Sequence, residues 1–166
     1  WANANFHIIA PSRWLADCVR ESSLLHHMHV HVIPNAINTS VYRPLDRHCA
    51  RSILGLPHDK KLVLFGAQNP DDPRKGATYM HQAIQRLTDT PLREHIELVQ
   101  IGGQRSPVAD LSMHILPYLQ DDLSLALAYS AADVFVAPSL QDNLPNTVVE
   151  ALACGVPCVA FQIGGM

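Results

Sequence analysis

Residues 133–161 read DVFVAPSLQDNLPNTVVEALACGVPCVAF, and this stretch decides the fold. The β-branched and aromatic run of residues 133–137 predicts a strand, and the turn formers of residues 138–143 end it. An apolar helix follows, until Gly155 and Pro157 signal its end ahead of a second apolar strand. Strand, helix and strand within about 30 residues form a βαβ unit, whose strands lie parallel and whose crossover is right-handed.

A single charge, Glu150, interrupts the apolar helix of this unit. A carboxylate with apolar neighbours on both sides is costly to bury unless a hydrogen bond satisfies it. Asn146 precedes it by four residues on the same helical face, and Asp142 and Asn143 lie at the helix entrance. The sequence therefore predicts a polar stripe at the carboxyl edge of a parallel strand, where open α/β sheets bind their ligands.

The same stretch, continued to Gly164-Gly165, resembles the donor-sugar motif of retaining GT-B glycosyltransferases of the glycogen-synthase-like group (glycosyl transferases group 1). In that family two acidic residues bracket seven others, and Asp142 and Glu150 have this spacing. The resemblance implies that Glu150 accepts hydrogen bonds from the ribose of a nucleotide-diphosphate sugar. It also implies that Asp142, shorter than the Glu of many members, approaches the sugar hydroxyls.

The loop and helix start after Asp142 are expected to meet the diphosphate or the sugar, again on the strength of the resemblance. The residues concerned are Asn143, Leu144, Asn146 and Thr147. A physical reason supports this role, because a helix N-terminus offers unpaired N–H groups and the positive end of the helix dipole to an anion.

A second candidate site follows the apolar strand predicted at residues 61–65, where a turn-rich loop leads to Arg74, Lys75 and Gly76. We expect both cations in the first turn of a helix that runs to about residue 87. Cations at a helix N-terminus are repelled by the positive end of the helix dipole. Either both are simply solvated, or a bound anion makes their position electrostatically favourable. The resemblance favours the anion, because a basic pair before Gly contacts the donor diphosphate in the family. Many members carry Arg where Ala67 stands, and we expect Arg74 to supply that charge.

The N-terminal part predicts a strand at residues 6–10, a helix at residues 13–25 capped by Ser12, and a histidine-rich strand ending near residue 34. One helical face is expected to hold Trp14, Leu15, Cys18 and Val19. His29 and His31 share a strand face, and without a carboxylate or cysteine at ligand spacing they indicate a solvated face and not a metal site.

Further strands are predicted at residues 96–101 and 113–116, and a helix at residues 123–132 capped by Asp121 or Asp122. Gly102-Gly103 is not a GxGxxG fingerprint, so a dinucleotide cofactor is not expected. The resemblance places the nucleotide base near Tyr118 and Leu119. The predicted fold class is α/β, a Rossmann-like parallel sheet with flanking helices, as in the second domain of a truncated GT-B fold.

Composition limits the alternatives. The chain has 166 residues, 48% of them hydrophobic, and a net charge of −3, which gives no reason to expect nucleic-acid binding. No apolar run approaches the ~20 residues of a transmembrane helix. The four cysteines lie in helix and strand patterns, as in reduced cytoplasmic proteins. The chain opens without Met, and we expect a piece of a longer protein. The resemblance implies that residues 1–44 end an N-terminal GT-B domain, and that residues 45–166 form most of a nucleotide-sugar-binding domain.

The expected activity is transfer of a hexose from a nucleotide-diphosphate donor to an acceptor with retention, in polysaccharide or glycoconjugate biosynthesis. Arg74, Lys75 and Asp142 are the expected catalytic residues; the donor is a substrate, and no cofactor or protein-bound metal is expected. The acceptor, a saccharide or a lipid-linked molecule, would contact the rest of the protein, so this chain alone is expected to be inactive. The cytoplasmic location expected allows peripheral association with the inner face of a membrane. An epimerase or phosphorylase on the same fold, and a non-catalytic nucleotide-binding or interaction module, remain as alternatives.

Overall fold

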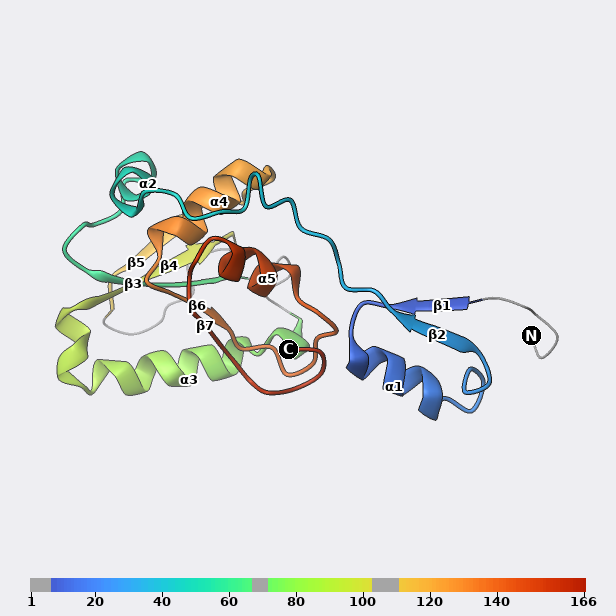
Figure 1. The fold of residues 1–166 in the computed structure, drawn as a ribbon. Coiled ribbons are helices and arrows are strands. Elements are labelled where there is room, and N and C mark those ends of the chain that lie inside the picture. The colour runs from blue at the N-terminus through green and yellow to red at the C-terminus, as the bar shows by residue number, and fades with distance from the viewer. Residues whose placement is uncertain (1–6, 67–71, 103–110) are drawn as a thin grey trace.

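The computed structural model describes residues 7–66, 72–102 and 111–166, which form a small N-terminal unit and a larger α/β unit (Figure 1). In the N-terminal unit, β1 (His7–Ala10) and β2 (His29–Val32) pair in parallel, and α1 (Arg13–Glu21) connects them. Ser12 caps α1 as predicted, because its hydroxyl oxygen accepts a hydrogen bond from the amide of Leu15 at 3.2 Å.

Two expectations for α1 are wrong. The helix ends at Glu21, before residue 25, because Ser22 leaves the helical conformation and its hydroxyl accepts from the amides of Leu24 and Leu25. Hydrogen bonds between a serine side chain and nearby backbone amides compete with the backbone hydrogen bonds that would continue the helix. The buried residues are Ala16 and Val19, while Cys18 is exposed. Of the four residues expected on the apolar face, Val19 is thus buried, Trp14 and Leu15 are partly buried, and Cys18 alone is exposed.

The larger unit confirms the predicted parallel sheet. Its strands, in the spatial order β5-β4-β3-β6-β7, are β5 (Met113–Leu116), β4 (Ile96–Ile101), β3 (Lys61–Gly66), β6 (Val134–Ala137) and β7 (Cys158–Ala160). All four neighbouring pairs are parallel. The chain runs outward from β3 to β5 and then returns to β6 beside β3. The sheet therefore reverses its direction of growth between β3 and β6, which is the topological switch point of a Rossmann-like fold.

Helices cover both faces of this sheet (Figure 1). They are α2 (Arg47–Leu54), α3 (Ala77–Thr88), α4 (Asp122–Ala131) and α5 (Asn146–Ala153), with short 3₁₀ turns η1 (Pro73–Lys75) and η2 (Pro91–Glu94). Side chains of β3 alternate between two cores, as a strand buried on both faces requires. Leu62 and Leu64 pack with α2, α4 and α5, while Val63 and Phe65 pack against the core that α3 covers.

An ion pair at the amino edge of the sheet holds β3 and β6 together. Arg51 on α2 is only 4% exposed, and its Nη2 lies 2.7 Å from the carboxylate of Asp133, directly before β6. The same carboxylate accepts from the amide of Leu62 on β3 at 2.8 Å. The buried charge is thus paired and hydrogen-bonded, and the two strands that flank the switch point are tied at their other end.

The connection between the two units packs partly on the larger one. Tyr42 is 5% exposed, lies in the core of the larger unit, and donates its hydroxyl to Asp122 at 3.0 Å. Ile37, Val41 and Leu45 pack around the same core. Residues 37–45 are therefore anchored to the sheet unit.

Candidate functional site

Two loops meet at the carboxyl ends of β3 and β6, at the switch point. The first leads from β3 through η1 into α3, and residues 67–71 of it, including Ala67, lie outside the described residues. The second follows β6 from Pro138 to Pro145 and leads into α5. The predicted candidates Arg74, Lys75 and Asp142 therefore come from two chain segments that the sheet order makes neighbours.

Gly76 allows these loops to touch. It has a φ of 69°, and a β-carbon added there would lie 1.8 Å from the carbonyl oxygen of Pro138. The amide of Leu140 donates to the carbonyl oxygen of Arg74 at 2.7 Å. A side chain at position 76 would separate the loops, so the glycine of the Arg-Lys-Gly pattern serves the close contact of two backbones.

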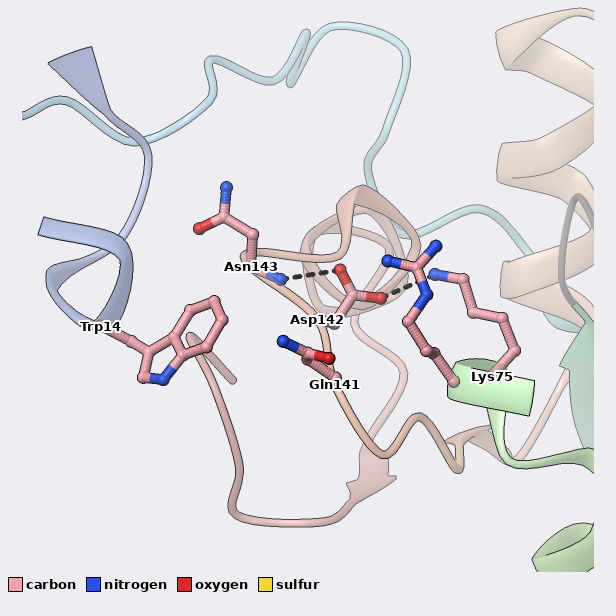
Figure 2. Close-up of a pocket in the computed structure, with 6 residues that line it drawn as sticks. Trp14, Lys75, Gln141, Asp142 and Asn143 are labelled. Carbon is pink, nitrogen blue, oxygen red and sulfur yellow. Dashed lines mark hydrogen bonds and ion pairs between the residues drawn. The ribbon is translucent and has the colours of Figure 1, made fainter. Parts of the chain in front are cut away.

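Lys75 and Asp142 form an ion pair across this contact (Figure 2). The lysine Nζ donates to Oδ2 of Asp142 at 2.7 Å, and the amide of Asn143 donates to Oδ1 at 2.9 Å. The side chains of Lys75 and Asp142 are 33% and 15% exposed. Both charges are thus partly buried. Partly buried charges interact more strongly with each other and with a ligand than charges in water do.

The expected position of Arg74 and Lys75 within a helix is wrong. They lie in η1, and α3 begins only at Ala77, because Gly76 in its left-handed conformation interrupts the helical backbone. The guanidinium group of Arg74 forms two hydrogen bonds with Asp72, at 2.7 and 3.1 Å, and hydrogen bonds from Arg74 lower the pKa of that carboxyl. The side chain of Arg74 is 66% exposed, twice the exposed fraction of Lys75.

A pocket of about 290 Å³ lies against the ion pair. Its lining residues are Trp14, Arg74, Lys75, Gln141, Asp142 and Asn143. Figure 2 shows Trp14 on α1, across from Asp142 and Gln141. Sequence reasoning assigned Trp14 to a helix face and did not select Gln141. Gln141 could have been identified because it directly precedes Asp142 in the motif. No local pattern distinguishes Trp14 from a core residue.

The N-terminal unit reaches the second loop through two further contacts. The hydroxyl of Ser12 donates to Oδ1 of Asn143 at 2.7 Å, and the side-chain amide of Asn35 donates to Oδ1 of Asn146 at 2.8 Å. Gly165 lies in the same place, since a β-carbon on it would come within 1.5 Å of the carbonyl oxygen of Asn143. The glycine pair of the sequence motif thus provides room for tight backbone packing behind the loop.

Glu150 lies on α5 and does not line the described pocket. It is half-buried, and its Oε2 accepts a hydrogen bond from the hydroxyl of Tyr129 at 2.9 Å. Burial raises the pKa of Glu150, the hydrogen bond from Tyr129 opposes this, and the negative charge of Asp122 adds to it. The expected hydrogen bond that makes a half-buried carboxylate tolerable is therefore present.

The remaining candidates are more dispersed. Asn146 and Thr147 are exposed in the first turn of α5, and Leu144 is partly buried before it. Tyr118 is 51% exposed just after the edge strand β5, while Leu119 packs against the main core. None of these five residues lines the described pocket.

The histidines form no site at the switch point. His7, His29 and His31 gather on the exposed side of β1 and β2, where Nδ1 of His7 lies 2.9 Å from Nε2 of His31. Within residues 7–66, 72–102 and 111–166, no three His, Cys, Asp or Glu side chains are arranged to hold a metal ion. The helices of this described part are all too short or too polar to cross a membrane.

Comparisons with known proteins identify the family and agree with the fold. Residues 59–166 match the family described as Glycosyl transferases group 1. D-inositol 3-phosphate glycosyltransferase from Streptomyces bingchenggensis is 33% identical over 82% of this chain and 33% of its own length. Sucrose-phosphate synthase from Thermosynechococcus elongatus aligns with a TM-score of 0.77 and 26% identity, over 96% of this chain and 41% of that one.

HepE from Anabaena, solved in complex with UDP and glucose, has a TM-score of 0.67 over 95% of this chain and 44% of that one. Its identity is 21%, so this likeness shows the fold alone. The chain spans about a third of the length of the Streptomyces relative. The match of residues 59–166, joined to a Rossmann-like sheet with a charged site at its switch point, shows that this chain belongs to the group 1 glycosyltransferases.

Proposed function

We propose that the protein transfers a hexose from a nucleotide-diphosphate sugar to an acceptor hydroxyl with retention of configuration, and that the larger unit binds the donor. The observation that carries this proposal is the Lys75–Asp142 ion pair, 2.7 Å long, at the switch point of the sheet. We further propose that residues 1–44 belong to the end of an N-terminal domain and its linker, and residues 45–166 to the donor-binding domain.

In this proposal, Lys75 and Arg74 bind the diphosphate. Lys75 is partly buried and already aligned by Asp142, so a phosphate oxygen gains a charge-assisted hydrogen bond from a cation held in place. Arg74 is exposed and extends from the adjacent position, where it adds a second positive charge. The side chain of Asn143 and the amides of Leu144, Asn146 and Thr147, at and just before the start of α5, complete the anion-binding region, with Gly76 permitting close approach of the loop.

The uncharged parts of the donor are assigned to the other candidates. Asp142 accepts hydrogen bonds from the sugar hydroxyls, with Leu144 beside it, and Glu150 accepts them from the ribose. Tyr118 and Leu119, after β5, are the proposed neighbours of the base. Carboxylates suit the two polar roles because an ionised carboxylate offers only acceptors to hydroxyl donors.

The reaction breaks the bond between the anomeric carbon and the diphosphate oxygen, and forms a bond from that carbon to the acceptor oxygen. The acceptor proton leaves with the diphosphate. Negative charge develops on the departing oxygen, and Lys75 and Arg74 are placed to stabilise it. The protein supplies electrostatics and placement in this scheme. The acceptor, a saccharide or lipid-linked molecule of polysaccharide or glycoconjugate synthesis, approaches from the side of the N-terminal unit.

The first test is calorimetric titration of the chain with UDP, GDP and ADP, and with the matching nucleosides. We expect one diphosphate to bind best, and Lys75→Ala to weaken it by about tenfold or more, since a hydrogen bond to a charged group contributes ~1.5–3 kcal/mol. Lys75→Ala should leave the nucleoside unaffected, because a nucleoside has no phosphate. Glu150→Ala should weaken both ligands, because both carry the ribose.

Lys61→Ala is the matched control. Lys61 lies at the amino end of β3, the strand whose other end leads to Lys75, and it is 71% exposed. Equal losses from both lysine variants would show general charge attraction and contradict the assigned site. If neither Lys75 nor Glu150 matters to nucleotide affinity, the non-catalytic interaction module becomes the better explanation. Product analysis with the whole protein, donor and acceptor then separates a transferase from an epimerase or phosphorylase.

A further inference from the structure

Tyr129 is a fully buried tyrosine whose hydroxyl has a defined partner. It lies in the last turns of α4, is 1% exposed, and its ring packs edge-on against Phe135 of β6 with ring centroids 5.5 Å apart. A ring so enclosed has little freedom to move. The position of its hydroxyl is therefore set by the core and not by solvent.

That hydroxyl donates to Oε2 of Glu150 at 2.9 Å, from α4 to α5 across 21 positions of sequence. Among the described residues no other group donates to this carboxylate, so Oε1 keeps both of its lone pairs for a ligand. A glutamate side chain has three rotatable bonds, and fixing one oxygen removes most of that freedom before a ligand arrives.

Within the described part of the chain, no cation is paired with Glu150. The titratable groups that shift the pKa of Glu150 are Tyr129 and Asp122 of α4. Glu150 in turn raises the pKa values of Tyr42 in the linker and of Cys154 at the end of α5. Burial and the charge of Asp122 raise the pKa of Glu150, and the hydrogen bond from Tyr129 is what favours the ionised form. The linker tyrosine, Tyr42, donates to Asp122 and not to Glu150.

We propose that Tyr129 is a positioning residue for the donor: it orients the carboxylate of Glu150 so that Oε1 accepts hydrogen bonds from the ribose hydroxyls. This inference rests on the proposed role of Glu150. It adds that ribose recognition depends on a residue of the protein core that touches no ligand. Preorganisation of this kind raises affinity by reducing what must be ordered on binding.

The experiment compares Tyr129→Phe with Tyr42→Phe in the full chain, using UDP and 2′,3′-dideoxy-UDP, or the corresponding ADP or GDP pair if the base screen selects one of those. Each variant removes one oxygen from a buried ring. We expect Tyr129→Phe to weaken the ribose ligand by about 3- to 10-fold, as one hydrogen bond would. It should leave the dideoxy ligand unchanged. Tyr42→Phe should affect neither ligand selectively.

The pH profile provides a readout that a merely structural role does not move. Affinity for the ribose ligand should fall as the pH drops through the pKa of Glu150, where the carboxylate is protonated. Removing the Tyr129 hydroxyl takes away the bond that lowers this pKa, so the midpoint should move to higher pH in Tyr129→Phe. Tyr42→Phe should not reproduce this shift.

Two results overturn the inference and leave the proposed function standing. One is that Tyr129→Phe binds the ribose ligand as wild type does while Glu150→Ala weakens it; the other is an equal loss for the ribose and dideoxy ligands. A different result removes both: if Glu150→Ala leaves ribose discrimination intact, or the wild-type chain discriminates neither ligand, the assigned role of Glu150 is wrong.

Discussion

At the scale of single residues, Glu150 shows a conflict between stability and function. A half-buried carboxylate without a cationic partner is unfavourable, and a neutral side chain of the same shape would suit α5 better. Tyr129 reduces the conflict through one hydrogen bond, which a glutamine oxygen could also accept. The charge itself is thus not needed for folding, which is consistent with a role in ligand binding.

Glu150→Gln is therefore expected to stabilise the chain while weakening nucleotide binding. Because the folded-state pKa is raised, the protonated carboxyl suits the fold better than the carboxylate does. The stability that it contributes is fully present below the unfolded pKa of about 4.3 and is lost as the pH rises through the folded pKa. The variant should melt roughly 1–3 °C higher at pH 7, a change below about 1 kcal/mol. The difference should shrink toward pH 4.

Thermal denaturation followed by circular dichroism at both pH values measures this effect. Glu94→Gln is a suitable control, since Glu94 is an exposed glutamate in η2. A Glu150→Gln variant that is less stable than wild type at pH 7 would mean that the carboxylate has a structural partner, and the argument for a binding role would be lost.

At the scale of elements, the turn η1 and the loop after β6 form the site because one glycine lets their backbones touch. Sequence reasoning found Arg74, Lys75 and Gly76 but placed the cations in a helix. Helical periodicity extends through residues 74–87, whereas no local pattern reveals the left-handed conformation of Gly76 or its close contact with the carbonyl group of Pro138.

Gly76→Ala is expected to destabilise the chain by more than the ~1–2 kcal/mol of a left-handed alanine, because its β-carbon would also collide with the backbone of Pro138. Gly55→Ala is the matched control: it has a φ of 64°, at the end of α2, and nothing lies within 4 Å of an added β-carbon. Urea unfolding gives the free energy of unfolding of both variants. Gly55→Ala reports the cost of backbone strain alone, and Gly76→Ala reports the cost of strain together with the steric collision.

Nucleotide titration completes that comparison. Gly76→Ala should also weaken UDP, GDP or ADP, whichever binds, since the collision moves Lys75 away from Asp142. Gly55→Ala should bind as wild type does. Equal destabilisation and equal affinity in the two variants would show that the loop contact does not determine the site.

At the scale of the whole molecule, the pocket has walls from both units. Trp14 and Ser12 of the N-terminal unit face or contact the loop of Asp142 and Asn143, as Figure 2 shows for Trp14. Residues more than 120 positions apart in the chain, such as Ser12 and Asn143 at a separation of 131, thus share one small region. A ligand bound in that region should therefore change the surroundings of Trp14 in the N-terminal unit.

The fluorescence of Trp14 is expected to report ligand binding. The chain has two tryptophans, Trp1 and Trp14, so a Trp1→Phe variant contains a single emitter, which lies in the pocket wall. Titration with the nucleotide-sugar donor should change its emission intensity or wavelength, and Lys75→Ala should shift the titration to higher concentration. A nucleotide that binds by calorimetry with no change in Trp14 emission would place the ligand outside this pocket.

The sequence by itself determined the elements, the caps and most of the candidate residues. Ser12 and Asp121 cap the starts of helices as predicted, and the strands appear where apolar runs and turn formers place them, because these features depend on neighbours a few residues away. The spacing of Asp142 and Glu150 and the Arg74-Lys75-Gly76 pattern were likewise readable from sequence. The family assignment follows from those motifs.

Only the tertiary structure decided which of these residues meet. Lys75 and Asp142 pair across 67 positions, Tyr129 holds Glu150, and Trp14 enters the pocket, while Tyr118 and Leu119 stay apart from it. The physical reason is that such pairings follow from strand order and from the crossover that sets β6 beside β3. Local periodicity carries no information on that order, so the chemistry of the site could be listed from the sequence but assembled only in the fold.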